Sequence, residues 1–152
     1  MEIMKRITII ILSMVLASCM ATGPAFNSLQ PEASDLVSIY IMRQSAFAAS
    51  AYCPPVTIDG EKIGCLKNGG YIHKYVSPGP HEVRFEKRFG EMGKEHFIKI
   101  NGKPGQTLFF EWAYDVNGVW STGFVSGATF SEAIVQYKKE QAIEILRNLN
   151  ES

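Results

Sequence analysis

The chain has 152 residues, of which 46% are hydrophobic, and this is enough for one domain with a buried core. Lysine plus arginine and aspartate plus glutamate each number 15, so the formal net charge is zero. Composition therefore gives no electrostatic basis for nucleic-acid binding, and no charge block indicates an interaction tail.

Residues 1–18 have the pattern of a secretory signal peptide. Lys5 and Arg6 precede an uncharged, mostly apolar run from Ile7 to Ala17. As a helix this run would reach about 16 Å, against about 30 Å of bilayer hydrocarbon. The run therefore predicts a cleaved signal peptide rather than a membrane span.

The signal peptide ends in Leu16-Ala17-Ser18-Cys19, which resembles the bacterial lipobox. The resemblance implies cleavage before Cys19, a diacylglycerol thioether on its sulfur and acylation of the new amine. Two or three acyl chains hold a protein at a membrane firmly, whereas one chain binds only marginally. Met20, in place of an aspartate, favours the outer membrane by the same analogy. The alternative is an ordinary signal peptide with a chance cysteine near the cut.

Residues 20–35 read MATGPAFNSLQPEASD, with two prolines, a glycine and no period of 2 or 3.6. Together with Cys19 they predict a flexible tether over residues 19–35, with a reach of about 22 Å as a coil. The patterned remainder, residues 36–152, is expected to form the folded domain.

Cysteine usage agrees with export. When Cys19 is assigned to lipid, Cys53 and Cys65 remain as an even pair. In an oxidising periplasm such a pair predicts a disulfide. The alternatives are two buried free thiols or half of a metal site.

The first segments of the domain predict strands. The sequence LVSIYIMR from Leu36 is apolar on both faces, which is typical of a central strand. Asp59-Gly60 predicts a hairpin turn between two short strands. After two more turns, the segment HEVRFEKRF alternates, with His81, Val83 and Phe85 on one face and charged residues on the other, which favours an antiparallel sheet.

The last segments predict a long aromatic strand and a helix. In TLFFEWAYDV one face carries Leu108, Phe110, Trp112 and Tyr114, and Asn117-Gly118 predicts a type I′ turn after it. Ser131 is a candidate N-cap for a helix over residues 131–149, whose apolar residues have roughly helical spacing. The predicted fold is mainly β, a small antiparallel β-sandwich with one C-terminal α-helix.

The stretch from Tyr40 to Val83 resembles small bacterial lipoproteins of uncharacterised function, whose domain is similar to the PEGA domain, a surface β-sandwich module. The matching positions are Tyr40, Arg43, Asp59, Gly60, Gly64, Leu66, Gly69, Tyr71, Pro78, Gly79 and His81. The resemblance implies an envelope lipoprotein with no catalytic residues, and it leaves the ligand open.

Candidate binding residues are an arginine and three aromatic residues. Arg43 ends an otherwise apolar strand, so it either reaches water or, if buried, forms an ion pair or contacts a ligand. Trp112, Tyr114 and Trp120 either pack in the core or line a groove for a sugar or peptide.

No motif for a nucleophile, phosphate or metal is complete, so we expect no enzyme, no cofactor and no metal. The hypothesis is a lipoprotein of the bacterial cell envelope, anchored at the outer membrane and facing the periplasm. Its partner would be another envelope protein, peptidoglycan or a glycan, and not nucleic acid. The alternative is a small periplasmic enzyme or metal-binding protein that uses His73, His81 or His96.

Overall fold

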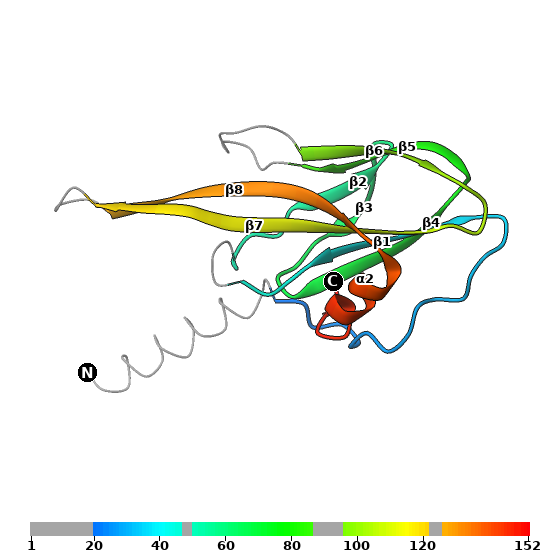
Figure 1. Cartoon of the computed structure of the whole chain (residues 1–152), viewed down its shortest axis with the longest axis horizontal. Helices are drawn as coiled ribbons and strands as arrows, with labels where there is room; N and C mark the ends of the chain where they lie inside the picture. The colour runs from blue at the N-terminus through cyan, green and yellow to red at the C-terminus, as the bar shows by residue number, and fades with distance from the viewer. Residues whose placement is uncertain (1–19, 47–49, 87–95, 122–125) are drawn as a thin grey trace, which may run out of the picture.

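The computed structural model describes residues 20–46, 50–86, 96–121 and 126–152, and for residues 114–121 and 126–132 it describes the backbone alone. The strands and the helix are, in chain order, β1 (Val37–Arg43), β2 (Pro55–Ile58), β3 (Glu61–Cys65), β4 (Gly70–Val76), β5 (Gly79–Phe85), β6 (His96–Gly102), β7 (Thr107–Ser121), β8 (Ser126–Tyr137), α2 (Lys139–Leu146) and β9 (Asn150–Glu151). The predicted fold class is confirmed: the protein is a small β-sandwich with a C-terminal helix (Figure 1).

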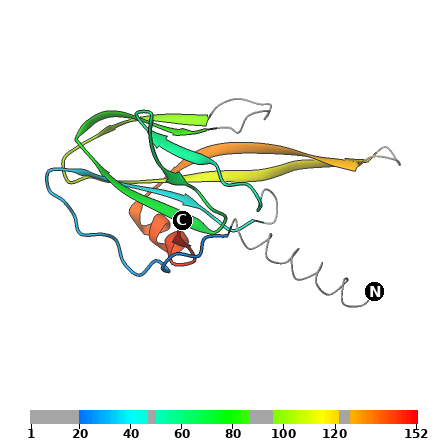
Figure 2. The ribbon, with the colours of Figure 1, turned by 180° about the vertical axis from the view of Figure 1, so that it is seen from behind.

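Two sheets and an outer layer make up the fold. One sheet has the order β8-β7-β1-β4-β9 and the other the order β3-β2-β5-β6. Neighbouring strands are antiparallel except for the pairs β1–β7 and β4–β9, which are parallel, so the five-stranded sheet is mixed. Helix α2 and the N-terminal segment lie against the face of the five-stranded sheet that is turned away from the other sheet (Figures 1 and 2).

Strand β1 lies at the centre of the five-stranded sheet, as its sequence predicted, and every one of its residues is buried. Ile39 and Ile41 face the core between the two sheets, whereas Tyr40 and Met42 face the helix side. Because both faces of the strand are covered, the sequence shows no polar alternation there.

The first hairpin forms as expected around Asp59 and Gly60. Their φ angles are 52° and 82°, and the left-handed region that both occupy is the one required by a type I′ turn. Pro55 pairs with Cys65 across the hairpin, and Cys53 is bonded to Cys65 with a Cα–Cα distance of 5.5 Å. The predicted disulfide is therefore confirmed.

The predicted turn at Asn117-Gly118 is wrong. Strand β7 continues to Ser121, and its register against β8 shifts between Val116 and Gly118. Asn117 is thus the extra residue of a β-bulge. The pairing of two long strands on both sides outweighs the local turn preference of the Asn-Gly pair, which a bulge also accommodates.

The predicted helix over residues 131–149 is also wrong in its first half. Strand β8 continues to Tyr137, and Ser131 pairs with Asp115 instead of capping a helix. Helix α2 begins only at Lys139, after an N-cap residue that makes no side-chain capping bond. The sequence from 133 to 137, AIVQY, is rich in β-branched and aromatic residues, so pairing with β7 prevails over the helical spacing.

The prediction of a flexible tether is wrong for residues 20–31, which we call the strap. The strap runs along the helix side of the sheet (Figure 1), with a backbone bond of 3.1 Å from Gly23 N to the Glu151 carbonyl and one of 2.9 Å from Phe26 N to the Leu149 carbonyl. The Phe26 ring also packs edge-on against Tyr71. Because the C-terminal residues offer unpaired backbone groups, the strap binds them despite its loop-like composition.

Cys19 and the signal peptide lie outside the described residues. In the part of the chain that is described, α2 is too short to span a bilayer, and no helix there has the length and apolarity of a membrane span.

Candidate functional site

The end of the sandwich at which β1 stops is built around Arg43, whose side chain is only 2% exposed. Its Nη1 donates to the carbonyl of Tyr52 at 2.5 Å and to that of Leu66 at 3.3 Å, and its guanidinium lies 4.9 Å from the centre of the Trp112 ring. The guanidinium therefore ties the loops around the disulfide to the core. Its role here is structural, which excludes the exposed strand-end arginine that the sequence analysis also allowed.

Trp112 belongs to the core rather than to a groove. It is 1% exposed and packs against the rings of Tyr52 and Phe85, with centroids 5.9 and 6.3 Å away. Trp120 lies eight residues further along the same strand, about 26 Å away in extended backbone. One ligand-sized site cannot contain both tryptophans. The side chains of Trp120 and Tyr114 are outside the description.

A buried glutamate beside this end was missed by the sequence analysis. Glu111 is 4% exposed, its Oε1 accepts a 2.9 Å bond from Gln44 Nε2, and its hydrogen bond with Tyr137 raises the pKa of that phenol. Glu111 pairs with Met42 of β1, whose side chain packs on the side of the sheet that α2 covers. The sequence signal was an acid between the aromatic residues Phe110 and Trp112 of this strand.

His81 joins two turns. Its Nδ1 lies 2.6 Å from Asp59 Oδ2 and its Nε2 lies 2.7 Å from the Ser77 carbonyl, while Asp59 Oδ1 accepts a bond from the Glu82 amide. The hydrogen bond with Asp59 raises the pKa of His81, and the same bond lowers the pKa of Asp59. A protonated ring satisfies both acceptors at once, so this group holds the Asp59-Gly60 turn against β5.

His73 lies on the other sheet and has different neighbours. Its Nε2 is 2.8 Å from Ser38 Oγ, and its ring packs against Tyr40 and Tyr75 at centroid distances of 4.5 and 4.6 Å. Burial lowers the pKa of this imidazole, which favours its neutral form. Ser38 is 6% exposed and thus poorly placed as a nucleophile.

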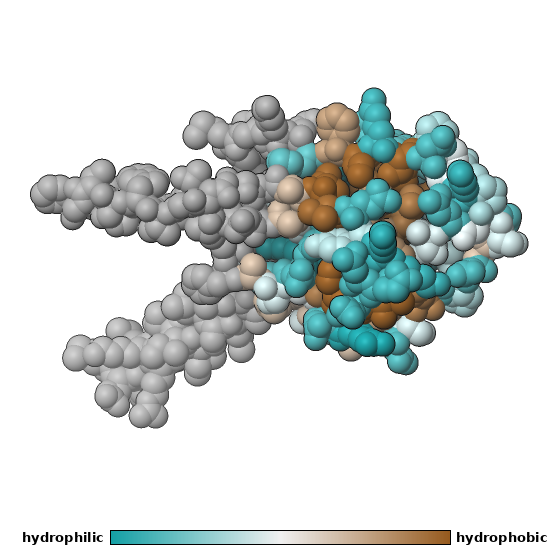
Figure 3. Space-filling model, viewed as in Figure 1, coloured by the Kyte–Doolittle hydropathy of each residue, from teal (hydrophilic) through white to brown (hydrophobic). Residues whose placement is uncertain are grey.

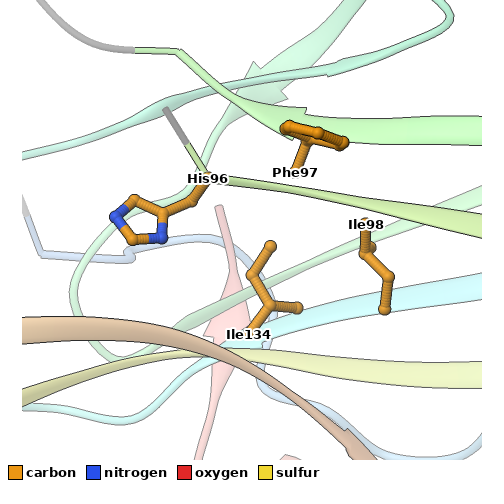
Figure 4. A pocket seen from close by; sticks show the side chains of 4 residues that line it. All are labelled: His96, Phe97, Ile98 and Ile134. Atoms are coloured by element: carbon orange, nitrogen blue, oxygen red, sulfur yellow. The ribbon is translucent and has the colours of Figure 1, made fainter. Parts of the chain in front are cut away.

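His96 lines a shallow hollow between the edge strands β6 and β8, together with Phe97, Ile98 and Ile134, with a volume of about 240 Å³ (Figure 4). His96 and Ile98 point from β6 towards Ile134, whereas Phe97 lies on the other face of β6 under the guanidinium of Arg84. Apolar side chains are visible on this side of the molecule between patches of hydrophilic ones (Figure 3). The lining of the hollow thus consists of three apolar side chains and the imidazole of His96.

The three histidines that the sequence analysis considered together are thus in three separate surroundings. Among the described residues, no three His, Cys, Asp or Glu side chains come together as metal ligands would. The arrangement that a triad or a zinc site requires, several such groups around one point, is not formed by these histidines in this part of the chain.

The residue next to Cys19 has a defined position. Met20 forms a parallel bridge with Asn68, and its sulfur accepts a 3.2 Å bond from Asn68 Nδ2. Asn68 is 2% exposed, and its carbonyl accepts a 3.0 Å bond from the amide of Ala21. The Ala21 carbonyl in turn accepts from Asn150 Nδ2. The side-chain amide and the backbone carbonyl of the buried Asn68 therefore hold the start of the strap together, a role that the Asn-Gly-Gly turn did not reveal.

The comparisons with known proteins give one match. A family model described as "Protein of unknown function (DUF2846)" matches residues 33–128, which is more than half of the chain. No curated protein and no solved structure matches.

Proposed function

We propose that this chain, which belongs to the DUF2846 family of proteins of unknown function, is a lipid-anchored protein of the bacterial cell envelope. Its β-sandwich would act without catalysis, by binding or positioning another envelope component. The lipobox-like sequence that ends at Cys19 supports the anchor, and Met20 in the second position supports the outer membrane, with the domain in the periplasm.

One observation carries the proposal. Met20 and Ala21 are bonded to Asn68, so the polypeptide is part of the folded domain from the residue after Cys19 onwards. Consecutive Cα atoms are about 3.8 Å apart. Acyl chains on Cys19 would consequently hold one particular end of the domain at the bilayer. We call the end formed by Met20, Arg43 and Asn68 the anchor end.

Two further observations support the proposal. The Cys53–Cys65 disulfide fits an oxidising compartment outside the cytoplasm. The three histidines hold turns, pack in an aromatic cluster or line an open hollow, which favours a binding or structural role. The domain itself would be a PEGA-like surface module. Its partner would be another envelope protein, peptidoglycan or a glycan.

The replacement Cys19→Ala tests the anchor. We expect the wild-type protein to fractionate with membranes and its intact mass to show loss of residues 1–18 and gain of the lipid. The Cys19→Ala protein should either remain uncleaved or appear in the soluble fraction. The double variant Cys53→Ala/Cys65→Ala is the matched control, because it removes two cysteines and should keep the lipid. A Cys19→Ala protein that is cut normally and stays with membranes would refute the proposal.

A further inference from the structure

The most unusual feature of the fold is the length of β7 and β8. Strand β1 pairs with β7 only as far as Glu111, whereas β7 and β8 remain paired to Ser121 and Ser126. We call residues 113–121 and 126–133 the arm. Nine residues of β7 correspond to about 30 Å of extended chain beyond the sheet. The arm projects from the body as a two-stranded ribbon (Figures 1 and 2).

The register shows at which end the arm leaves the body. Because β7 is parallel to β1, it continues past Glu111 in the direction in which β1 ends at Arg43. Arg43 pairs with Gly70. Gly70 is two residues after Asn68, which forms the bridge with Met20. The arm therefore extends from the anchor end, past the level of Met20 and away from the body.

The sequence of the arm is different from that of the rest of the chain. From Val116 to Ser131 the chain contains no Asp, Glu, Lys or Arg, although these make up 20% of the protein. The register of β8 against β7 sets Val116 opposite Phe130, Val119 opposite Ala128 and, near the end of the arm, Trp120 opposite Gly127. Uncharged segments with Trp, Phe, Gly, Ser and Thr suit the interface of a bilayer, where tryptophan is enriched.

A ribbon of this kind is poorly stable by itself. In the described part of the chain, β7 and β8 pair only with each other beyond Glu111. An isolated two-stranded ribbon is marginally stable in water, and an exposed uncharged edge invites association. The arm thus needs a surface to cover it, and its position next to the proposed lipid anchor makes that surface the membrane.

We infer that the arm is a second membrane contact: its uncharged outer part, around Val119 and Trp120, lies in the interfacial region of the bilayer that the lipid on Cys19 enters. This inference rests on the proposed function. If Met20 is held within a few ångströms of the bilayer surface, an arm that extends about 30 Å beyond the sheet from the same end of the domain must lie along the bilayer or enter it. The two contacts together would fix the orientation of the domain.

The two tryptophans of the chain allow a direct test. The lipidated protein is inserted into preformed phosphatidylethanolamine–phosphatidylglycerol vesicles, with or without brominated acyl chains. In the variant Trp112→Phe the emission comes from Trp120 alone, and in Trp120→Phe it comes from the buried Trp112. We expect bromine to reduce the Trp120 emission at least about twofold, with a shift to shorter wavelength, because tryptophan settles in the interface. The Trp112 emission should stay unchanged.

A charge placed on the arm sharpens the test. In the Trp112→Phe background, Val119→Glu should abolish most of the quenching, since a carboxylate is costly to move out of water. Asn101→Glu is the matched control: Asn101 is exposed on β6 near Gly102, at the opposite end of the domain, and quenching should persist. If Trp112→Phe fails to fold by circular dichroism, the wild-type protein is compared with Trp120→Phe, and only the wild type should be quenched.

The outcomes separate this inference from the proposed function. An intact mass without lipid on Cys19 refutes the proposed function itself. A protein that carries the lipid and floats with vesicles, but whose Trp120 is unquenched, refutes the inference and leaves the anchor standing. Crosslinking of the arm to a second copy or to another protein, again without quenching, also overturns the membrane contact.

Discussion

The five-stranded sheet has different surroundings in the body of the sandwich and in the arm. In the body, β1 is covered by the second sheet on one face and by α2 and the strap on the other, and all seven residues are buried. In the arm, β7 and β8 continue the sheet as a pair without that cover from other described strands. The hydrogen-bonded ladder is common to both regions, whereas among the described side chains the packing against a second layer is found in the body.

The largest difference is expected from the two tryptophans. Trp112→Ala leaves a cavity beside Phe85 and Arg43, and it should lower the free energy of unfolding by about 3–5 kcal/mol. Trp120→Ala, in the arm, should change it by less than about 0.5 kcal/mol in the absence of membranes. Urea unfolding followed by circular dichroism measures both. Equal losses would show that the arm is part of the cooperative core.

Removal of the disulfide should rank next. Cys53 and Cys65 are separated by 12 positions, and a bond that closes such a loop contributes about 3 kcal/mol in the chain-entropy model. Cys53→Ser/Cys65→Ser should lower the free energy of unfolding by about this amount and leave the arm unaffected. Reduction of the wild-type protein with dithiothreitol is the matched control. No change in the urea midpoint after reduction would contradict the prediction.

A substitution in the strap, on the helix side of the five-stranded sheet, should lower the free energy of unfolding by less. A Cβ on Gly23 would meet the carbonyl oxygen of Glu151, with which the Gly23 amide is bonded. Gly23→Ala should therefore detach the start of the strap, at a cost of about 1 kcal/mol for a lost hydrogen bond. Hydrogen–deuterium exchange should then become faster at Ala21 and Phe26. The control Gly60→Asn should leave it unchanged, because a Cβ at Gly60 meets nothing and asparagine tolerates positive φ.

The smallest effect concerns pH. The folded-state pKa of His81 is raised by Asp59, so this contact contributes stability below the unfolded pKa of about 6.5 and loses it as pH rises through the folded pKa. Asp59→Asn should consequently cost about 0.5 kcal/mol more at pH 5.5 than at pH 9, since the pair is partly exposed. Asparagine keeps the positive φ accessible. A cost that is the same at both pH values would contradict the role of the charged pair.

The sequence predicted the body better than its ends. Strand β1, the Asp59-Gly60 turn and the disulfide were found because local chemistry and tertiary structure agree there. The bulge at Asn117, the late start of α2 and the docked strap were missed, because each depends on a partner distant in sequence. Periodicity and turn motifs describe neighbouring residues, so they do not show which distant segments pair with each other.

The candidate site shows the same division. Arg43 was singled out correctly as an unusual residue, but its partners, the carbonyls of Tyr52 and Leu66, are set by loop geometry. Trp112 and Trp120 looked alike in the sequence, and the length of β7 separates them into a core residue and an arm residue. Asn68 gave only a turn signal, although it fixes Met20.

The emission of Trp120 in brominated vesicles tests most directly which end of the domain faces the bilayer. For the lipidated Trp112→Phe protein we predict clear quenching, and for the lipidated Trp120→Phe protein none. If the first protein carries its lipid by mass but its emission is not quenched, the arm does not contact the bilayer and this orientation of the domain is wrong.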